Sequence, residues 1–268
     1  MEGPEEPPRP PFLARRDMRI AHWPLVGDFR LVLAVVTAYV YAVKIAGPRF
    51  MERRRPYDGI KPLIVIYNVT MVVANVYLTC GILRAYLGDL HYSVVCQGID
   101  YDGCDESTMG LMAVLWWFYV SRFADLLDTV FFVLRKKDSH VSVLHVAHHT
   151  IVLLSACYGL TFGIDGQGAF SIMINCFVHV VMYSYYLLSL MGPTVQKHLW
   201  WKRYLTQFQL VQFVVQFVHM MIPMFMECRY PLSHCWVVIL QCVFYFGMFI
   251  RFYLKAYRPK QIGVTKAK

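Results

Sequence analysis

The sequence predicts an all-α membrane protein with about seven transmembrane helices. Hydrophobic residues make up 57% of the 268-residue chain and charged residues only 16%, whereas typical soluble domains carry roughly 25% charged residues. A helix that crosses a bilayer needs about 20 mostly apolar residues, and apolar runs of this length follow one another with short loops between them. The spans are expected at residues 27–45, 62–86, 109–134, 141–160, 168–191, 204–226 and 233–257.

These spans form one polytopic domain over residues 27–257, flanked by two short tails. The chain begins MEGPEEPPRPPF, which is rich in proline and glutamate and lacks the apolar region of a signal peptide. We therefore expect residues 1–26 to be a disordered tail, with the first span acting as the insertion signal. Residues 258–268 are expected to be a basic tail.

Basic residues occur in alternate loops, which predicts the orientation of the chain. The segments after the first, third, fifth and last spans are rich in lysine and arginine, whereas residues 88–108 are acidic. The basic side is therefore expected to be cytosolic, with the N-terminus lumenal and the C-terminus cytosolic. Arg15, Arg16 and Arg19 oppose this pattern. The net charge of +9 is read as an orientation signal, and no nucleic-acid partner is expected.

Four of the eight cysteines lie in or beside the predicted lumenal loops. An oxidising lumen permits disulfides there, and spacing alone does not decide the pairing among them. These cysteines are Cys96, Cys104, Cys228 and Cys235.

Histidines inside the membrane point to chemistry, because ionisable groups within spans usually face the bundle interior and serve a function. His145, His148 and His149 lie at i, i+3 and i+4 of the fourth span, which places them on one helical face. Such a cluster suits either metal binding or acid–base and nucleophilic catalysis.

The fifth span carries a matching polar stripe at helical spacing. Asn175, His179, Tyr183 and Tyr186 fall within a narrow arc. Tyrosines alone would indicate packing or interfacial anchors, but an asparagine and a histidine on the same stripe favour a polar cavity.

The third and sixth spans also offer one polar face each. In the third span, Arg122 and Asp125 are one turn apart and can neutralise each other, which leaves structural ion pairing as an equal alternative. Asp128 and Thr129 follow on nearby positions. The sixth span carries a stripe that can join helices by hydrogen bonds or line the same cavity; it comprises Thr206, Gln209, Gln212, Gln216 and His219.

A metal centre is not expected. Membrane di-iron desaturases and hydroxylases share an HxxHH box, but their chemistry draws histidine ligands from several such boxes. Of the ten histidines in this chain, only five lie within the predicted spans, too few for two irons. A seven-helix receptor or small transporter is the non-enzymatic alternative, although neither needs clustered histidines.

Four motifs in order resemble those of the very-long-chain fatty acid elongases, the membrane 3-ketoacyl-CoA synthases. They are RFADLLDTVFFVLRKK, HVAHH, NCFVHVVMYSYY and TQFQLVQ. The resemblance runs from the first span to the last. Arg122 and Asp125 stand where the family usually has Lys and Glu, and Arg and Lys differ in hydrogen-bonding geometry.

The resemblance implies a fold, a location and a reaction. Six of the seven helices would form an inverted barrel around a closed-ended acyl tunnel, in the endoplasmic reticulum membrane, with a lumenal disulfide between Cys96 and Cys228. The reaction would condense a long-chain acyl-CoA with malonyl-CoA, giving 3-ketoacyl-CoA, CO2 and CoA, without a cofactor. Other enzymes of the elongation cycle and a second copy of the chain are further expected partners.

Roles for individual residues follow as expectations. His148 or His179 would be the nucleophile that forms an acyl-imidazole, the other would act in acid–base chemistry, and His145 and His149 would set their tautomers. Asn175, Tyr183 and Gln209 are candidate donors to the reacting oxygens. Further candidate substrate-binding residues in the spans are Arg122, Asp128, Tyr186 and Gln212. Candidates to hold the CoA phosphates are Lys136, Lys137, Lys202 and Arg203.

Overall fold

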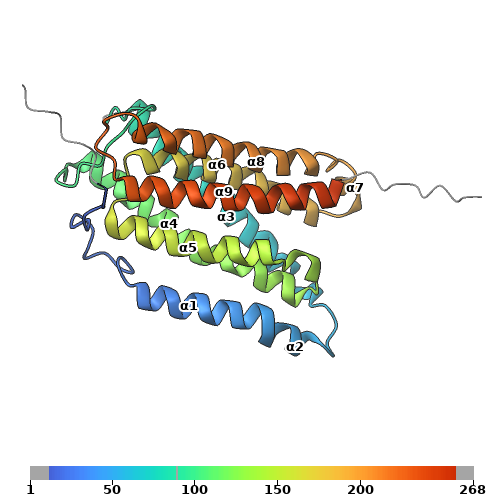
Figure 1. Ribbon diagram of the computed structural model, residues 1–268. Coiled ribbons are helices and arrows are strands. Elements are labelled where there is room, and N and C mark those ends of the chain that lie inside the picture. Colours follow the sequence, from blue (N-terminus) through green and yellow to red (C-terminus); the bar gives the residue numbers. More distant parts are fainter. Residues whose placement is uncertain (1–11, 89, 258–268) are drawn as a thin grey trace, which may run out of the picture.

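The computed structural model describes residues 12–88 and 90–257, and this part of the chain folds as a bundle of long helices (Figure 1). Seven helical segments in it are long and apolar enough to cross a membrane, which confirms the predicted fold class. The long helices are α1 (Phe29–Tyr41), α3 (Lys61–Leu87), α4 (Glu106–Leu134), α5 (Val143–Phe162), α6 (Gln167–Leu190), α8 (Lys202–Met221) and α9 (Leu232–Tyr257).

Short helical pieces complete the spans or connect them. A π-helical turn, η1 (Ala42–Ala46), and α2 (Gly47–Met51) extend the first span beyond its predicted end at residue 45. The remaining pieces are η2 (Asp58–Ile60), η3 (Asp138–His140), α7 (Pro193–Gln196) and η4 (Ile222–Met224). Gly47 permits the extension, because a Cβ there would lie 2.8 Å from Cγ1 of Val133 on α4.

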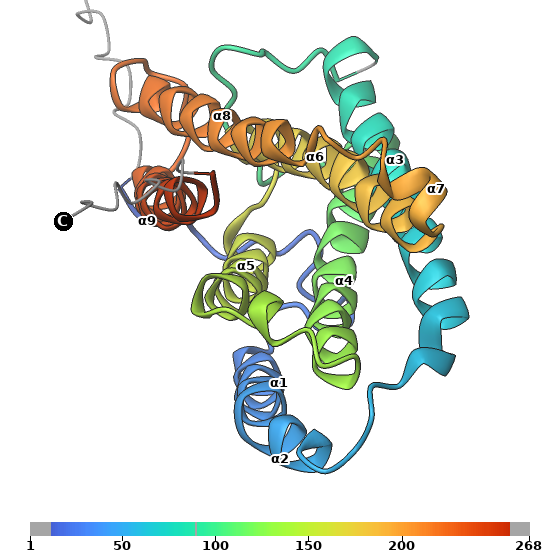
Figure 2. The same ribbon diagram turned by 90° about the vertical axis from the view of Figure 1, so that its right-hand side faces the viewer.

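Helices α3, α4, α5, α9, α8 and α6 follow one another around a ring (Figure 2). Helix α3 packs against α4 and α6, α6 packs against α8, α8 against α9, α9 against α5, and α5 against α4. Helix α1 lies outside this ring and packs against α5. The inverted order of the predicted barrel and its acyl tunnel stay predictions, whereas the closed sequence of helix neighbours is a feature of the fold.

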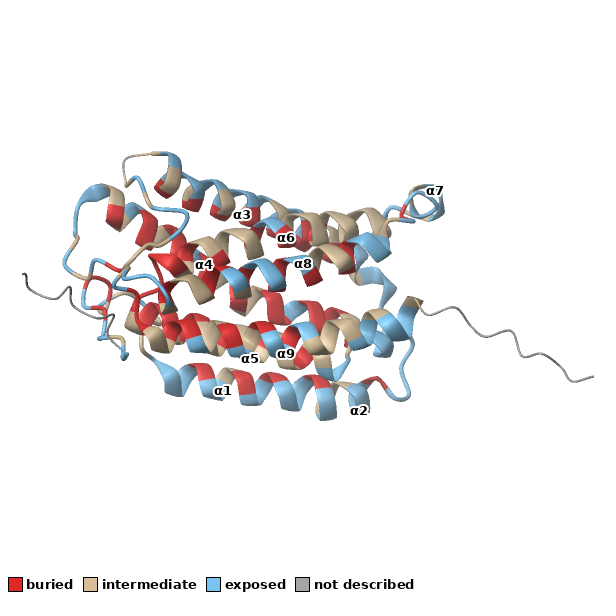
Figure 3. Cartoon of the chain, turned by 45° about the horizontal axis from the view of Figure 1, so that its top comes forward, coloured by how far each residue is buried: buried red, intermediate tan, exposed pale blue. Residues whose placement is uncertain are grey.

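Buried and exposed side chains divide the bundle into an interior and a lipid-facing surface (Figure 3). Leu115, Leu153 and Leu160 are fully buried within the largest apolar core cluster. Large apolar residues such as Val73 on α3 and Leu240 on α9 are each 63% exposed. Outward-facing apolar side chains are expected where the surrounding solvent is lipid.

The bundle has two distinct ends. We call one the disulfide end: it gathers the N-terminal segment and the loops before α4, between α5 and α6, and before α9 (left in Figure 1). We call the other the basic end, where α2, η2, η3 and α7 lie.

Residues 12–28 are packed against the disulfide end, so the prediction of a disordered tail over 1–26 is wrong for this part. Ile20 and Asp17 are fully buried, and the Asp17 amide donates a hydrogen bond to the Thr161 carbonyl at 2.9 Å. The sequence signal failed because proline and charge dominate residues 1–16, whereas the packing depends on a few residues after them. Residues 1–11 and the predicted basic tail at 258–268 lie outside the described residues.

Candidate active site

The histidine box occupies the first turns of α5. Ser142 begins the helix, because its side chain accepts a hydrogen bond from the His145 amide, as a helix N-cap does. The rings of His145 and His149 are 4.3 Å apart and those of His148 and His149 are 5.6 Å apart. The i, i+3, i+4 spacing therefore brings the three rings together as predicted.

His145 is tied to the neighbouring helices by a short polar chain. Its Nε2 is 2.9 Å from the Thr129 hydroxyl on α4, and the same hydroxyl is 2.6 Å from the Tyr39 hydroxyl on α1. Sequence reasoning placed Thr129 on the polar face but missed Tyr39. The available signal was a pair of tyrosines, Tyr39 and Tyr41, in the first span.

Arg122 connects the acidic residues of α4 to the histidine of α6. Its guanidinium lies 2.9 Å from an Asp125 carboxylate oxygen and 3.3 Å from Nδ1 of His179. A guanidinium can only donate hydrogen bonds, so His179 Nδ1 is the acceptor. A neutral His179 therefore carries its proton on Nε2.

Tyr183 joins the two carboxylates of α4. Its hydroxyl lies 2.9 Å from Oδ1 of Asp125 and 2.8 Å from Oδ2 of Asp128, and the Tyr67 hydroxyl on α3 is 3.3 Å away. Asp125, Asp128 and Tyr183 are each at least 95% buried. The polar faces predicted for the third and fifth spans thus meet inside the bundle.

A cavity of about 150 Å³ begins at the histidine box. His148, Asn175 and Gln212 line it, and it extends to Tyr230 and His234 at the disulfide end. His148 is half-buried and its ring is 4.9 Å from that of Tyr245, another residue of the wall. The cavity thus extends from one histidine of the box toward the disulfide end.

Several predicted site residues lie outside the wall of this cavity. Gln209 donates to the Met182 sulfur at 3.8 Å. Tyr186 packs its ring 6.0 Å from Tyr183 and 6.5 Å from Phe132. His179 is also behind the wall, held by Arg122.

The basic end brings together the lysines proposed for phosphate binding. Lys136 donates to the Glu52 carbonyl at 3.3 Å, while Lys137, Lys202 and Arg203 are exposed. The pKa of His140 is lowered by partial burial and then by the positive charges of Lys202 and Lys137. The segments between α4 and α5 and before α8 therefore form one positively charged patch.

At the disulfide end, the structure pairs Cys96 with Cys228, with Cα atoms 5.5 Å apart. This is the pairing that the resemblance implies. Cys104 is exposed and Cys235 is buried, and neither is bonded to another cysteine of the described chain.

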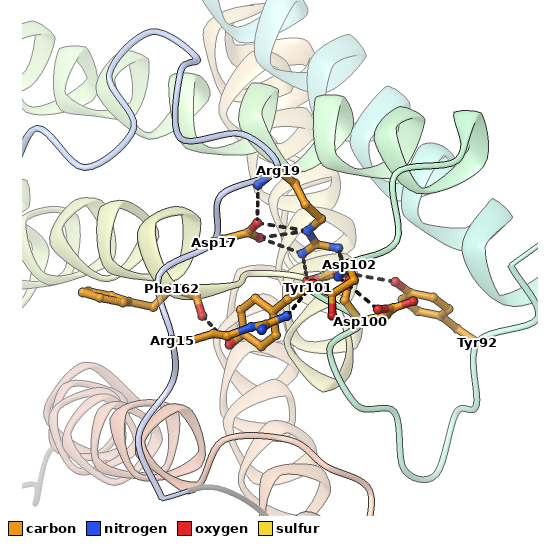
Figure 4. Close-up of polar contacts among 9 residues, drawn as sticks. Arg15, Asp17, Arg19, Tyr92, Asp100, Tyr101, Asp102 and Phe162 are labelled. Atoms are coloured by element: carbon orange, nitrogen blue, oxygen red, sulfur yellow. Dashed lines mark hydrogen bonds and ion pairs between the residues drawn. The ribbon is translucent and has the colours of Figure 1, made fainter.

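The same end holds a buried ion network that the sequence reasoning missed (Figure 4). Arg19 lies 2.6 Å from Asp17 and 2.9 Å from Asp165, and it also donates to the Asp100 carbonyl at 2.7 Å. Arg15 forms an exposed ion pair with Asp102 at 2.9 Å. These acidic partners neutralise two of the three arginines that opposed the predicted orientation.

Within residues 12–88 and 90–257, no group of three or more His, Cys, Asp or Glu side chains is arranged to hold a metal ion.

Fold and site together define a polytopic membrane protein with a histidine-centred cavity inside a ring of helices. A family model described as the GNS1/SUR4 family, ELO, matches residues 24–263. The chain belongs to this family.

Curated relatives cover most of the chain. It is 41% identical over 244 residues to a very long chain fatty acid elongase of Aedes aegypti, covering 90% of this chain and 67% of the relative. It is 38% identical to very long chain fatty acid elongase 4 of Mus musculus, over 93% of this chain and 79% of the relative. It is 39% identical to very long chain fatty acid elongase 7 of Rattus norvegicus, over 91% of this chain and 87% of the relative. The protein is therefore a multi-pass membrane enzyme of fatty acid elongation.

Proposed function

We propose that this protein is the condensing enzyme of fatty acid elongation, which joins an acyl-CoA to malonyl-CoA through an acyl-imidazole on His148. The observation that carries the proposal is the unequal state of two histidines. His148 is on the cavity wall, whereas His179 is buried with its Nδ1 facing Arg122.

The first step is acyl transfer to His148. A neutral imidazole nitrogen attacks the thioester carbon, the C–S bond breaks, and the ring proton is transferred to the departing CoA thiolate. The Nε2–H of His179 is free to donate, because Nδ1 already accepts from Arg122. With the Asn175 amide on the cavity wall, it supplies hydrogen-bond donors for the oxyanion that develops in this step.

The second step is decarboxylative condensation. Malonyl-CoA loses CO2 as its C–C bond breaks, the resulting enolate attacks the acyl-imidazole carbonyl, and the imidazole leaves as the 3-ketoacyl-CoA forms. The sum of the two steps consumes one proton. An acidic or basic side chain positioned for proton transfer contributes typically about 10² to 10⁴ in rate, and His179 has this role.

The CoA group and the acyl chain of the substrate would lie toward opposite ends of the protein. The positive patch at the basic end, with Lys136, Lys137, Lys202 and Arg203, suits the CoA phosphates. The acyl chain would extend along the cavity toward the disulfide end. We propose that the basic end faces the cytosol and the disulfide end the lumen of the endoplasmic reticulum, with the N-terminus lumenal and the C-terminus cytosolic.

The test separates acyl transfer from condensation. Purified protein is incubated with an acyl-CoA alone, and peptides are searched by mass spectrometry for an acyl group. Wild type and His179→Gln are expected to carry the adduct on His148, His148→Ala to carry none, and the exposed-residue control His22→Ala to match wild type.

With labelled malonyl-CoA added, wild type and the His22 control are expected to form 3-ketoacyl-CoA. His179→Gln should be slower by about 10² or more, and His148→Ala inactive. An adduct on His179 instead of His148, or full turnover by His148→Ala, would overturn the assignment.

A further inference from the structure

The cavity ends in an unusual group of side chains at the disulfide end. His234, on the first turn of α9, is only 4% exposed. Its ring lies near the backbone carbonyl of Gly163, but neither ring nitrogen makes a hydrogen bond of good geometry within the described part of the protein. Its ring lies between two tyrosine rings, 4.9 Å from Tyr158 and 5.7 Å from Tyr230. All three line the cavity.

A second polar group on the same wall is also without a partner. Ser171 on α6 is only 7% exposed, and its hydroxyl oxygen makes no hydrogen bond among the residues that the structure describes. Buried polar groups are normally hydrogen-bonded, because leaving one unpaired costs free energy. A purely hydrocarbon chain in this passage would leave the His234 and Ser171 groups unsatisfied.

Glycines at this end of the wall let neighbouring side chains approach the backbone closely. Gly159, Gly163 and Gly168 line the cavity, and a Cβ on Gly168 would lie 2.9 Å from the Tyr230 hydroxyl oxygen. The backbone of Gly163 has φ +100°, a conformation that residues other than glycine rarely adopt. The glycines therefore allow Tyr230 and its neighbours to pack closely around the end of the cavity.

We propose that this end of the cavity is a subsite for an acyl chain that carries a hydroxyl group at or near its methyl end. The proposal rests on the proposed condensing activity and names its substrate class. With one ring nitrogen of the neutral imidazole directed to the Gly163 carbonyl, the other nitrogen can accept a hydrogen bond from a hydroxyl group. A terminal carboxylate would not match, because the described residues that line the cavity include no lysine or arginine and burying an unpaired charge is far more costly.

The length of helix α5 between His148 and Tyr158 predicts the length of the acyl chain that fits the cavity. Tyr158 is ten residues after His148 on α5, which corresponds to about 15 Å of helix at 1.5 Å per residue. An extended acyl chain advances about 1.2 Å along its axis per bond, the same advance per backbone bond as in a fully extended polypeptide. A hydroxyl bound at His234 would therefore be about 12 to 16 atoms from the thioester carbonyl.

The experiment compares matched pairs of acyl-CoA substrates with even chain lengths from about 10 to 20 carbons. Each pair has the same length, with or without a terminal hydroxyl, and formation of labelled 3-ketoacyl-CoA from malonyl-CoA gives kcat/KM. Wild type is expected to prefer the hydroxylated member by about five-fold, the factor for one net hydrogen bond. The preference should peak at one length within the range and decline on either side.

His234→Phe keeps a ring of similar shape and removes both nitrogens. It is expected to remove the difference in kcat/KM between the two members of each pair, and this ratio is the readout because His234 lines the cavity and its replacement changes the turnover of both members. His22→Phe, an exposed histidine near the same end, should retain the preference.

The outcomes are distinguishable. Failure of every acyl-CoA to react would refute the condensing function itself. If wild type turns over unsubstituted chains and shows no preference for hydroxylated chains at any length, the proposed subsite is refuted. It is also refuted if the preference survives in His234→Phe. Stronger turnover of chains with a terminal carboxylate would overturn the proposed class.

Discussion

Replacing Arg19 by leucine is expected to destabilise the disulfide end strongly. The Arg19 side chain is 1% exposed and contacts two carboxylates whose own exposures are 0% and 1%, those of Asp17 and Asp165. The substitution leaves both acidic groups buried without a counter-charge. Removing one partner of a buried ion pair costs about 3–5 kcal/mol.

The measurement is thermal unfolding of the detergent-purified protein. At roughly 2–4 °C per kcal/mol for a chain of this size class, Arg19→Leu should lower Tm by on the order of 10 °C. The matched control is Arg15→Leu, because Arg15 and Asp102 are 57% and 88% exposed. Exposed pairs contribute about 0–1 kcal/mol, so the control should stay within a few degrees of wild type.

Equal shifts in the two variants would refute this reasoning, since they differ mainly in burial. A third variant, Arg19→Lys, keeps the charge but cannot reproduce the two-sided contacts of a guanidinium. It should unfold between wild type and Arg19→Leu.

Two further predictions concern the polar chain on α5 and the pH dependence of stability. Thr129→Val removes the hydroxyl shared by Tyr39 and His145, so condensation should slow by about ten-fold or more as His145 loses its partner, whereas Thr129→Ser should restore most of the rate. Burial raises the pKa of Asp165, although Arg19 opposes the shift. The folded protein therefore binds the Asp165 proton more tightly than the unfolded chain does. This contribution to stability is full below the ordinary carboxyl pKa and is lost as the pH rises through the raised pKa. Asp165→Asn should flatten the fall in Tm as the pH rises above about pH 4, and an unchanged slope would show that other groups cause it.

Much of the site was predictable because helical spacing is a local property. His145, His148 and His149 share a face on any α-helix, and their rings do come together. The spans were also predictable, since apolar composition over about 20 residues reports the bilayer directly. The predicted boundaries differ from the observed ones mainly at the first span, where a π turn continues the helix.

Other features depend on contacts between distant segments. Gln209 shares the polar stripe of α8 with Gln212, yet only Gln212 lines the cavity. The difference arises from the rotation of α8 against α6, which the period of the sequence does not determine. The same holds for Arg19, whose partner Asp165 is 146 residues away.

By itself the sequence determined that this chain crosses the membrane about seven times and that four spans carry polar faces, because hydrophobicity and helical period act over a few turns. Only the tertiary structure decided which polar groups meet. Arg122 reaches His179 across 57 residues of sequence and assigns its tautomer, while His148 is left on the cavity wall. Such pairings depend on the order, rotation and tilt of helices in the ring, which are set by packing between segments far apart in the chain.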